Sequence, residues 1–119
     1  MLGLFKKALT DDLRAAAAAE GLTIRQVMTL ASLVEKETAS ADERPLVAAV
    51  YRNRLKRGMP MQADPTVIYA LQKAGTYDGN LSRADLQFDS PYNTYRYPGL
   101  PPGPIASPGR ASIVATIHP

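Results

Sequence analysis

The chain has 119 residues, about the length of one globular domain, and 45% of them are apolar, which excludes a disordered polar tail. It has no cysteine, so disulfides and thiolate zinc sites are excluded. Lys and Arg outnumber Asp and Glu by 14 to 11, for a net charge of +3. This mild excess suits an anionic polymer or a nucleic acid, and equally an ordinary solvated surface.

The first half of the chain predicts three helices. Residues 4–20 are rich in alanine, the best helix former. The second helix follows a capping box made of Thr23 and Gln26. Ser40 or Asp42 is expected to cap the third, "LVAAVYRNRLKR". No apolar run reaches the roughly 20 residues of a membrane span, and the first residues lack the order of a signal peptide.

The second half predicts two further helices and a long irregular segment. Asp64 before Pro65, and later Ser107 before Pro108, are typical helix starts, a capping residue with proline at the first helical position. Seven of the ten prolines lie at or after Pro91, and they exclude a regular helix or a central strand from the segment "FDSPYNTYRYPGLPPGPIASPG" before the last helix. The fold class predicted is α+β, a mainly helical single domain with a small sheet around "MPMQ" and "YNTYRY".

The proline-rich segment has two interpretations. Long stiff loops that carry tyrosines are often walls of a ligand groove. The alternative is a structural wrap over a pair of helices. Composition does not separate the two.

Two carboxylates close the second helix. Successive residues of a helix are about 100° apart, so Glu35 and Glu37 point about 200° away from each other. Glu35 falls on the apolar side of the predicted helix, and Glu37 falls at the opposite margin of that side. An apolar setting raises the pKa of a carboxyl group, as a general acid near neutral pH requires. The alternative is a half-buried Glu35 that pairs with an arginine. Because the two acids point apart, a mechanism with one carboxylate is more natural than the two-acid pattern of ordinary glycosidases.

Other chemistries find little support in the sequence. His118 is alone beside the last proline and is expected at the surface. No metal-ligand cluster, glycine-rich phosphate loop or serine triad is visible, so no metal and no cofactor are predicted.

Three long motifs in the order found here, "LASLVEKET", "ERPLVAAVYRNRLKRGMPMQADPTVIYAL" and "SPYNTYRYPGLPPGPIASPG", resemble the endolytic murein transglycosylases of the YceG-like family. The resemblance covers residues 23–119, which it identifies as the catalytic core behind an N-terminal helix at 1–22. It implies cleavage of peptidoglycan glycan strands without water, leaving a 1,6-anhydro-muramoyl end.

The resemblance also implies site residues. The first acid of "EKE", Glu35, corresponds to the catalytic residue. The groove candidates come from two further motifs and are Gln62, Asp64, Tyr92, Asn93, Thr94 and Tyr95. Tyrosine faces stack on sugar rings and amides hydrogen-bond N-acetyl groups. The basic excess suits the anionic stem peptides.

The family acts at the outer face of the plasma membrane behind an N-terminal anchor, which implies a place in the cell envelope and other cell-wall synthesis proteins as partners. Compared with the family, this chain is expected to lack the anchor and the C-terminal segment, so a weak homodimer through an uncovered apolar patch is predicted. Two alternatives stay open: a non-catalytic peptidoglycan-binding remnant and a basic nucleic-acid-binding module.

Overall fold

The structure is a computed structural model that describes residues 11–19 and 21–118. Residues 11–19 are helical, and the remaining part of the predicted N-terminal helix, residues 1–10 and 20, lies outside the described residues. The further elements, in chain order, are α2 (Ile24–Glu37), α3 (Arg44–Lys56), α4 (Asp64–Ala74), the 3₁₀ turn η1 (Ala84–Gln87) and α5 (Arg110–Ile117).

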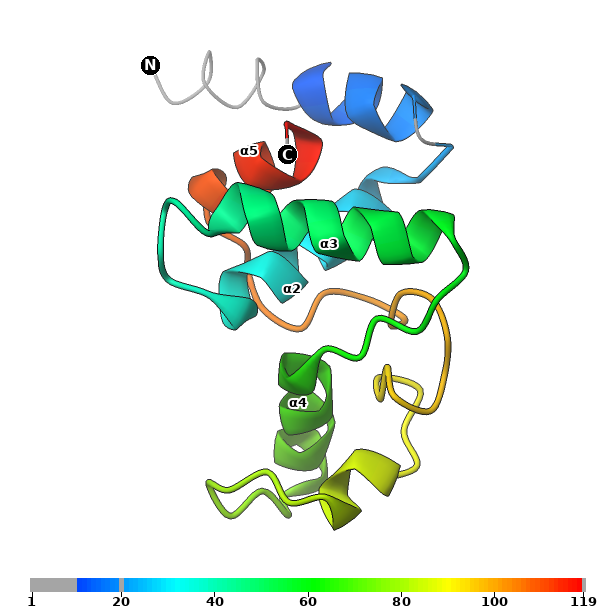
Figure 1. Cartoon of the computed structure of the whole chain (residues 1–119), viewed down its shortest axis with the longest axis vertical. Helices are drawn as coiled ribbons and strands as arrows, with labels where there is room; N and C mark the ends of the chain where they lie inside the picture. Colours follow the sequence, from blue (N-terminus) through cyan, green and yellow to red (C-terminus); the bar gives the residue numbers. More distant parts are fainter. Residues whose placement is uncertain (1–10, 20, 119) are drawn as a thin grey trace.

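Helix α2 is the central element. It packs against α3, α4 and α5, and α3 also packs against α5. In Figure 1 helix 11–19 and α5 lie at one end of the molecule, and α4 with η1 lies at the other. The proline-rich segment returns from η1 past α4 to reach α5.

Two apolar clusters hold these elements together, both through α2. One joins helix 11–19 to α2 and α5, with buried Leu13, Ala17, Val27, Ala31, Ile113 and Ile117. The other joins α2 to α3, to the segment before α4 and to the proline-rich loop, with buried Leu30, Leu33, Val34, Ala48, Tyr51, Met61, Ala63, Ile105 and Ala115. Burial of a side chain of this size stabilises the fold by roughly 1.5–3 kcal/mol.

Two polar residues of α2 are covered as well. Thr29 and Ser32 are buried, and the proline-rich loop bonds to Ser32. Ser32 Oγ donates to the Thr29 carbonyl at 2.6 Å and accepts from the Ile105 N–H at 3.1 Å. Arg25 Nε donates to the Pro102 carbonyl at 3.3 Å. This part of the loop is therefore a structural wrap.

The predicted α+β class is wrong, because no strand occurs among residues 11–19 and 21–118. The segments "MPMQ" and "YNTYRY" do lie side by side, since the Gln62 N–H donates to the Thr94 carbonyl at 3.4 Å. They do not continue as a ladder. Gln62 has a φ of 49°, outside the extended region, and the Thr94 hydroxyl accepts the next N–H, that of Ala63, at 2.9 Å.

Some helices are capped by residues next to them in the sequence, and one is capped by a residue from another helix. The capping box at Thr23 and Gln26 is confirmed, with both reciprocal bonds present. The prediction that Ser40 or Asp42 caps the third helix is wrong, because the N-cap residue of α3 is Glu43. The last helix starts after Gly109, two residues later than predicted, and its cap comes from α2.

Candidate active site

Glu35 lies in the last turn of α2 and faces the start of α5. Its Oε1 accepts two hydrogen bonds, from the Gly109 N–H at 2.7 Å and from the Ser112 hydroxyl at 3.0 Å. The first four N–H groups of a helix have no partner within it, so a carboxylate at this place satisfies one of them. Glu35 is half-buried, and its carboxylate is held by contacts 74 and 77 residues away in the chain.

These bonds decide the ionisation of Glu35. The Gly109 N–H, and then the Ser112 hydroxyl, hold the pKa of Glu35 below its ordinary value; burial opposes them, and Arg44 and Lys36 lower the pKa further. The expected rise in pKa is therefore wrong. Donors and positive charge aimed at the carboxylate outweigh its partial loss of water.

Ser112→Ala should raise the pKa of Glu35 toward its ordinary value, since it removes one of the two donors. Because the folded-state pKa is depressed, ionised Glu35 stabilises the fold above the ordinary pKa, and this is lost as pH falls through the folded-state pKa. Ser112→Ala should shrink that loss. An NMR titration of the Glu35 carboxyl carbon measures it, with Ser82→Ala, far from Glu35, as the control. An unchanged pKa would show that Ser112 does not matter.

Glu37 faces Tyr51 on α3, whereas Glu35 faces α5. Burial first, and then the Glu37 carboxylate, raise the pKa of the Tyr51 hydroxyl on α3. Glu37 also contributes to the raised pKa of Tyr95. Glu35 instead lies against α5. The two acids therefore do not face one another across a common gap.

Two of the predicted groove residues meet beside α4. The Tyr95 hydroxyl donates to Asp64 Oδ1 at 2.5 Å. Burial and this hydrogen bond raise the pKa of Tyr95 to about 12. Gln62, two residues before Asp64, is exposed and carries the positive φ. Asp64 and Tyr95 thus form a polar pair near Glu37.

Tyr92 belongs to an aromatic group that the sequence did not indicate. Its ring lies 4.9 Å from that of Tyr69, and Lys73 Nζ lies 5.2 Å from the Tyr92 ring centre and 5.5 Å from that of Tyr69. Tyr69 and Lys73 are one helical turn apart on α4. That spacing was the available signal, although it is common on any helix. Cavities of about 240 and 340 Å³ open beside Tyr69 and Tyr92.

Asn93 and Thr94 are fully buried and hydrogen-bonded within the chain. The Asn93 amide donates to the carbonyls of Leu86 at 3.0 Å and Phe88 at 2.8 Å, and its oxygen accepts from the Tyr95 N–H at 2.9 Å. Thr94 shares a hydrogen bond of 2.9 Å with Thr66. Both side chains hold the loop in shape.

The described residues contain neither a metal-binding cluster nor a membrane-spanning helix. Within residues 11–19 and 21–118, no group of three His, Cys, Asp or Glu side chains is placed to hold a metal ion. None of the helices in the same part of the chain is both long and apolar enough to cross a bilayer.

The whole chain is similar to known proteins. The model of the YceG-like family matches residues 1–119. The chain is 46% identical over 98 residues to a Bacillus subtilis protein named endolytic murein transglycosylase, and 43% identical over 104 residues to a Streptococcus pneumoniae protein of the same name. These matches cover 82% and 83% of this chain but only 26% and 18% of the two proteins.

A solved structure agrees with the fold. A crystal structure of a yceG-like protein from Listeria monocytogenes is similar with a TM-score of 0.78 at 40% identity, over 89% of this chain and 34% of that one. The present chain thus spans about a third or less of the length of these relatives. From the family model, which matches it throughout, and from these similarities, we conclude that the chain belongs to the YceG-like family.

Proposed function

We propose that this chain is the catalytic core of a peptidoglycan lytic transglycosylase with Glu35 as its one acid and base. The observation that carries the proposal is the fixed carboxylate: Glu35 occupies the "EKE" motif and is held by Gly109 and Ser112 at the start of α5. The relatives named endolytic murein transglycosylase support the substrate class.

The reaction needs one carboxyl group in two protonation states. Protonated Glu35 donates to the glycosidic oxygen between the muramoyl and glucosaminyl units, and the bond from that oxygen to muramoyl C1 breaks. The positive charge is carried by an oxocarbenium ion or taken up by the N-acetyl group. The C6 hydroxyl then attacks C1 and gives its proton to the Glu35 carboxylate, which closes the anhydro ring. Neither water nor a cofactor enters the balance.

Because the pKa of Glu35 is lowered in the free protein, substrate binding must raise it before Glu35 can act as an acid. In the free protein the carboxylate is the favoured form near neutral pH, which suits the second step and not the first. A bound glycan excludes water from the half-buried carboxyl group, and desolvation raises its pKa. Because Gly109 and Ser112 both bond to Oε1, we assign proton transfer to Oε2.

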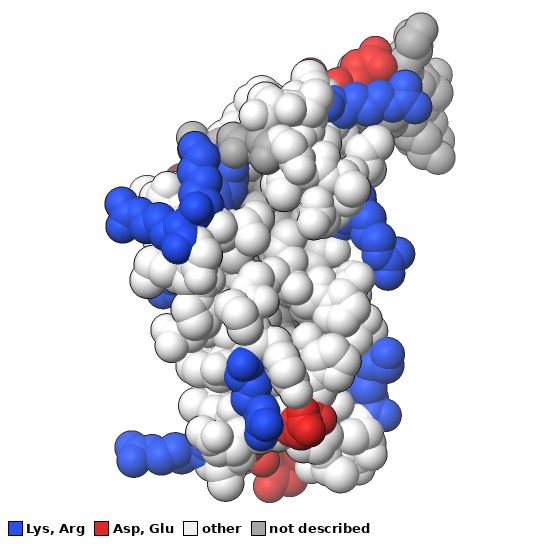
Figure 2. All heavy atoms as spheres, turned by 90° about the vertical axis from the view of Figure 1, so that its right-hand side faces the viewer, with Lys and Arg blue, Asp and Glu red and all other residues white. Residues whose placement is uncertain are grey.

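The same lowered pKa favours a second candidate function. A carboxyl group that stays ionised in the complex holds the strand and cannot cleave it, as in a non-catalytic peptidoglycan-binding remnant. A nucleic-acid-binding module has weaker support. On the face in Figure 2, Lys and Arg side chains are scattered around a largely uncharged centre and form no continuous basic stripe.

Mass spectrometry of purified peptidoglycan after incubation with the chain tests the proposal. Transglycosylase activity should produce 1,6-anhydro-muramoyl ends and no reducing muramic acid. Binding to sedimented peptidoglycan without any new ends would support the remnant instead. Binding to DNA that falls steeply with salt, without affinity for glycan, would support the third function.

We further propose that Gln62, Asp64, Tyr92 and Tyr95 contact the glycan, and that Asn93 and Thr94 act by holding this wall in place. The family implies a site of action at the cell envelope, at the outer face of the plasma membrane, with other cell-wall synthesis proteins as partners.

The predicted weak homodimer has a candidate surface on α3. Leu46 is 68% exposed and Val50, one turn later, 47%. Exposed apolar side chains on one face favour association. Sedimentation over a wide concentration range should show a dimer that Leu46→Glu abolishes and that Asn80→Glu, in an exposed loop, leaves unchanged. A monomer at every concentration would reject the dimer.

A further inference from the structure

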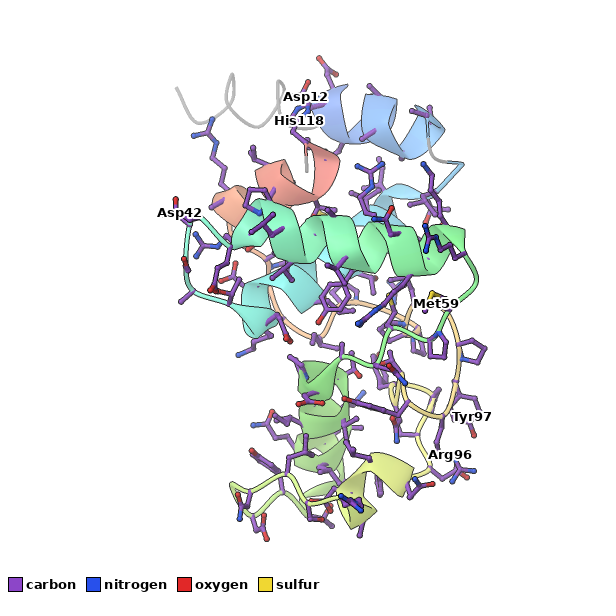
Figure 3. All side chains as sticks on the ribbon, in the orientation of Figure 1. Asp12, Asp42, Met59, Arg96, Tyr97 and His118 are labelled. Carbon is purple, nitrogen blue, oxygen red and sulfur yellow. The ribbon has the colours of Figure 1, made fainter. Side chains whose placement is uncertain are left out.

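A cavity of about 530 Å³ lies between α3 and α5, next to the candidate active site. The residues that define its character are Arg44, Pro45, Arg110, Ala111, Val114 and His118. Its lining runs from Ala41, in the loop before α3, to His118 at the end of α5, and Figure 3 labels His118 and the neighbouring loop residue Asp42. Its volume is that of a typical small-ligand site.

The polar part of this cavity is positive for two reasons. Arg44 and Arg110 both line it. Each is also the first residue of its helix, so the positive end of the α3 dipole lies there, while the Glu35 carboxylate already occupies that of α5. Neither helix receives a hydrogen bond from the side chain of its own capping residue. Glu43, the residue just before α3, accepts from the Thr38 hydroxyl at 2.7 Å.

Arg44 carries an unused donor at this place. Its Nε is buried and has no hydrogen-bond partner among the residues that the structure describes. A buried donor without a partner is unfavourable, which makes the Arg44 guanidinium a candidate to bind an acceptor that enters the cavity. A carboxylate suits best, because a guanidinium binds it through two parallel hydrogen bonds.

Apart from the two arginines and His118, the lining is apolar, and the cavity lies close to Glu35. Pro45, Ala111 and Val114 provide surface for a methyl group. Arg44 is near enough to lower the pKa of Glu35, and Arg110 follows the glycine whose N–H bonds to Glu35. A ligand in the cavity therefore lies beside the reacting sugar.

We infer that this cavity binds the stem peptide of the muramoyl unit that is cleaved; the inference rests on peptidoglycan as the substrate proposed above. The peptide is joined to the lactyl group of the same sugar whose C1 bond breaks, and it begins with alanine and a glutamate whose α-carboxylate is free. The alanine methyl packs against Ala111 and Val114, and the α-carboxylate pairs with Arg44 and Arg110. Strands whose glutamate is amidated or whose peptide is absent are the poorer ligands.

Binding of two small probes to the whole chain tests the inference without any cleavage. One is N-acetylmuramoyl-L-alanyl-D-glutamate with its γ-carboxyl blocked as a methylamide, and the other is the same molecule with its α-carboxyl amidated. By NMR titration the acid should bind about tenfold more tightly, as a charged hydrogen bond provides, and should shift the signals of Ala111 and Val114.

Arg44→Gln should remove the preference for the acid probe, and Arg57→Gln, an exposed arginine at the other end of α3, should keep it. Val114→Glu provides a second test on a partly exposed side chain, should Arg44→Gln unfold: its new negative charge should repel the acid probe. Equal binding of both probes by the wild type, or a preference that survives both variants, would overturn the inference.

The outcomes separate the inference from the proposed function. If the chain forms anhydro ends and binds both probes equally, the inference fails and the transglycosylase stands. If the acid probe is preferred and no anhydro ends form, the cavity stands as a peptide site of a binding remnant.

Discussion

Glu35→Gln should abolish the formation of 1,6-anhydro-muramoyl ends while the chain stays folded. An amide neither donates a proton to the glycosidic oxygen nor takes one from the C6 hydroxyl, and general acid–base catalysis contributes about 10²–10⁴-fold to a rate. Its carbonyl oxygen still accepts from the Gly109 N–H and the Ser112 hydroxyl, so the contact with α5 remains. Mass spectrometry of the digest measures the product, and circular dichroism the fold.

Glu37→Gln is the matched control. It makes the same change two residues away, on the side of α2 that faces Tyr51, and should reduce product formation far less. A Glu35→Gln variant with more than about a hundredth of the wild-type rate would reject Glu35 as the acid and base. If Glu37→Gln reduces product formation more than Glu35→Gln does, the acid and base must be sought in the group formed by Glu37, Asp64 and Tyr95.

Asn93→Ala should lower the free energy of unfolding by about 2–4 kcal/mol, one of the largest effects of any substitution in this chain. The side chain is fully buried and makes three hydrogen bonds, to Leu86, Phe88 and Tyr95. Alanine would leave two carbonyls and one N–H without these partners. Urea denaturation followed by circular dichroism gives the free energy.

Tyr97→Phe is the control in the same loop. It removes a hydrogen bond between an exposed hydroxyl and Asp89, and should change stability by less than about 0.5 kcal/mol. If Asn93→Ala keeps its stability but loses affinity for glycan, Asn93 contacts the substrate directly, as the family resemblance implies. A loss of stability supports its role as the residue that positions Tyr95.

Local chemistry allowed much of this protein to be determined from the sequence by itself. The capping box at Thr23 needs only residues three apart, and Gly75, in the left-handed conformation that glycine adopts readily, closes α4. Helix periodicity placed Glu35 and Glu37 on different sides of α2, and the structure directs them to different helices. The motifs around Glu35 identified the family, which the comparisons confirmed.

Tertiary contacts decided the rest. Ser32 is a polar residue, yet it is buried because a loop 73 residues later bonds to it. The predicted sheet is absent because the Thr94 side chain takes a hydrogen bond that a ladder would need. The direction of the Glu35 pKa shift depended on Gly109, 74 residues away, because a carboxylate responds to the donors that surround it and not to the helix face on which it lies.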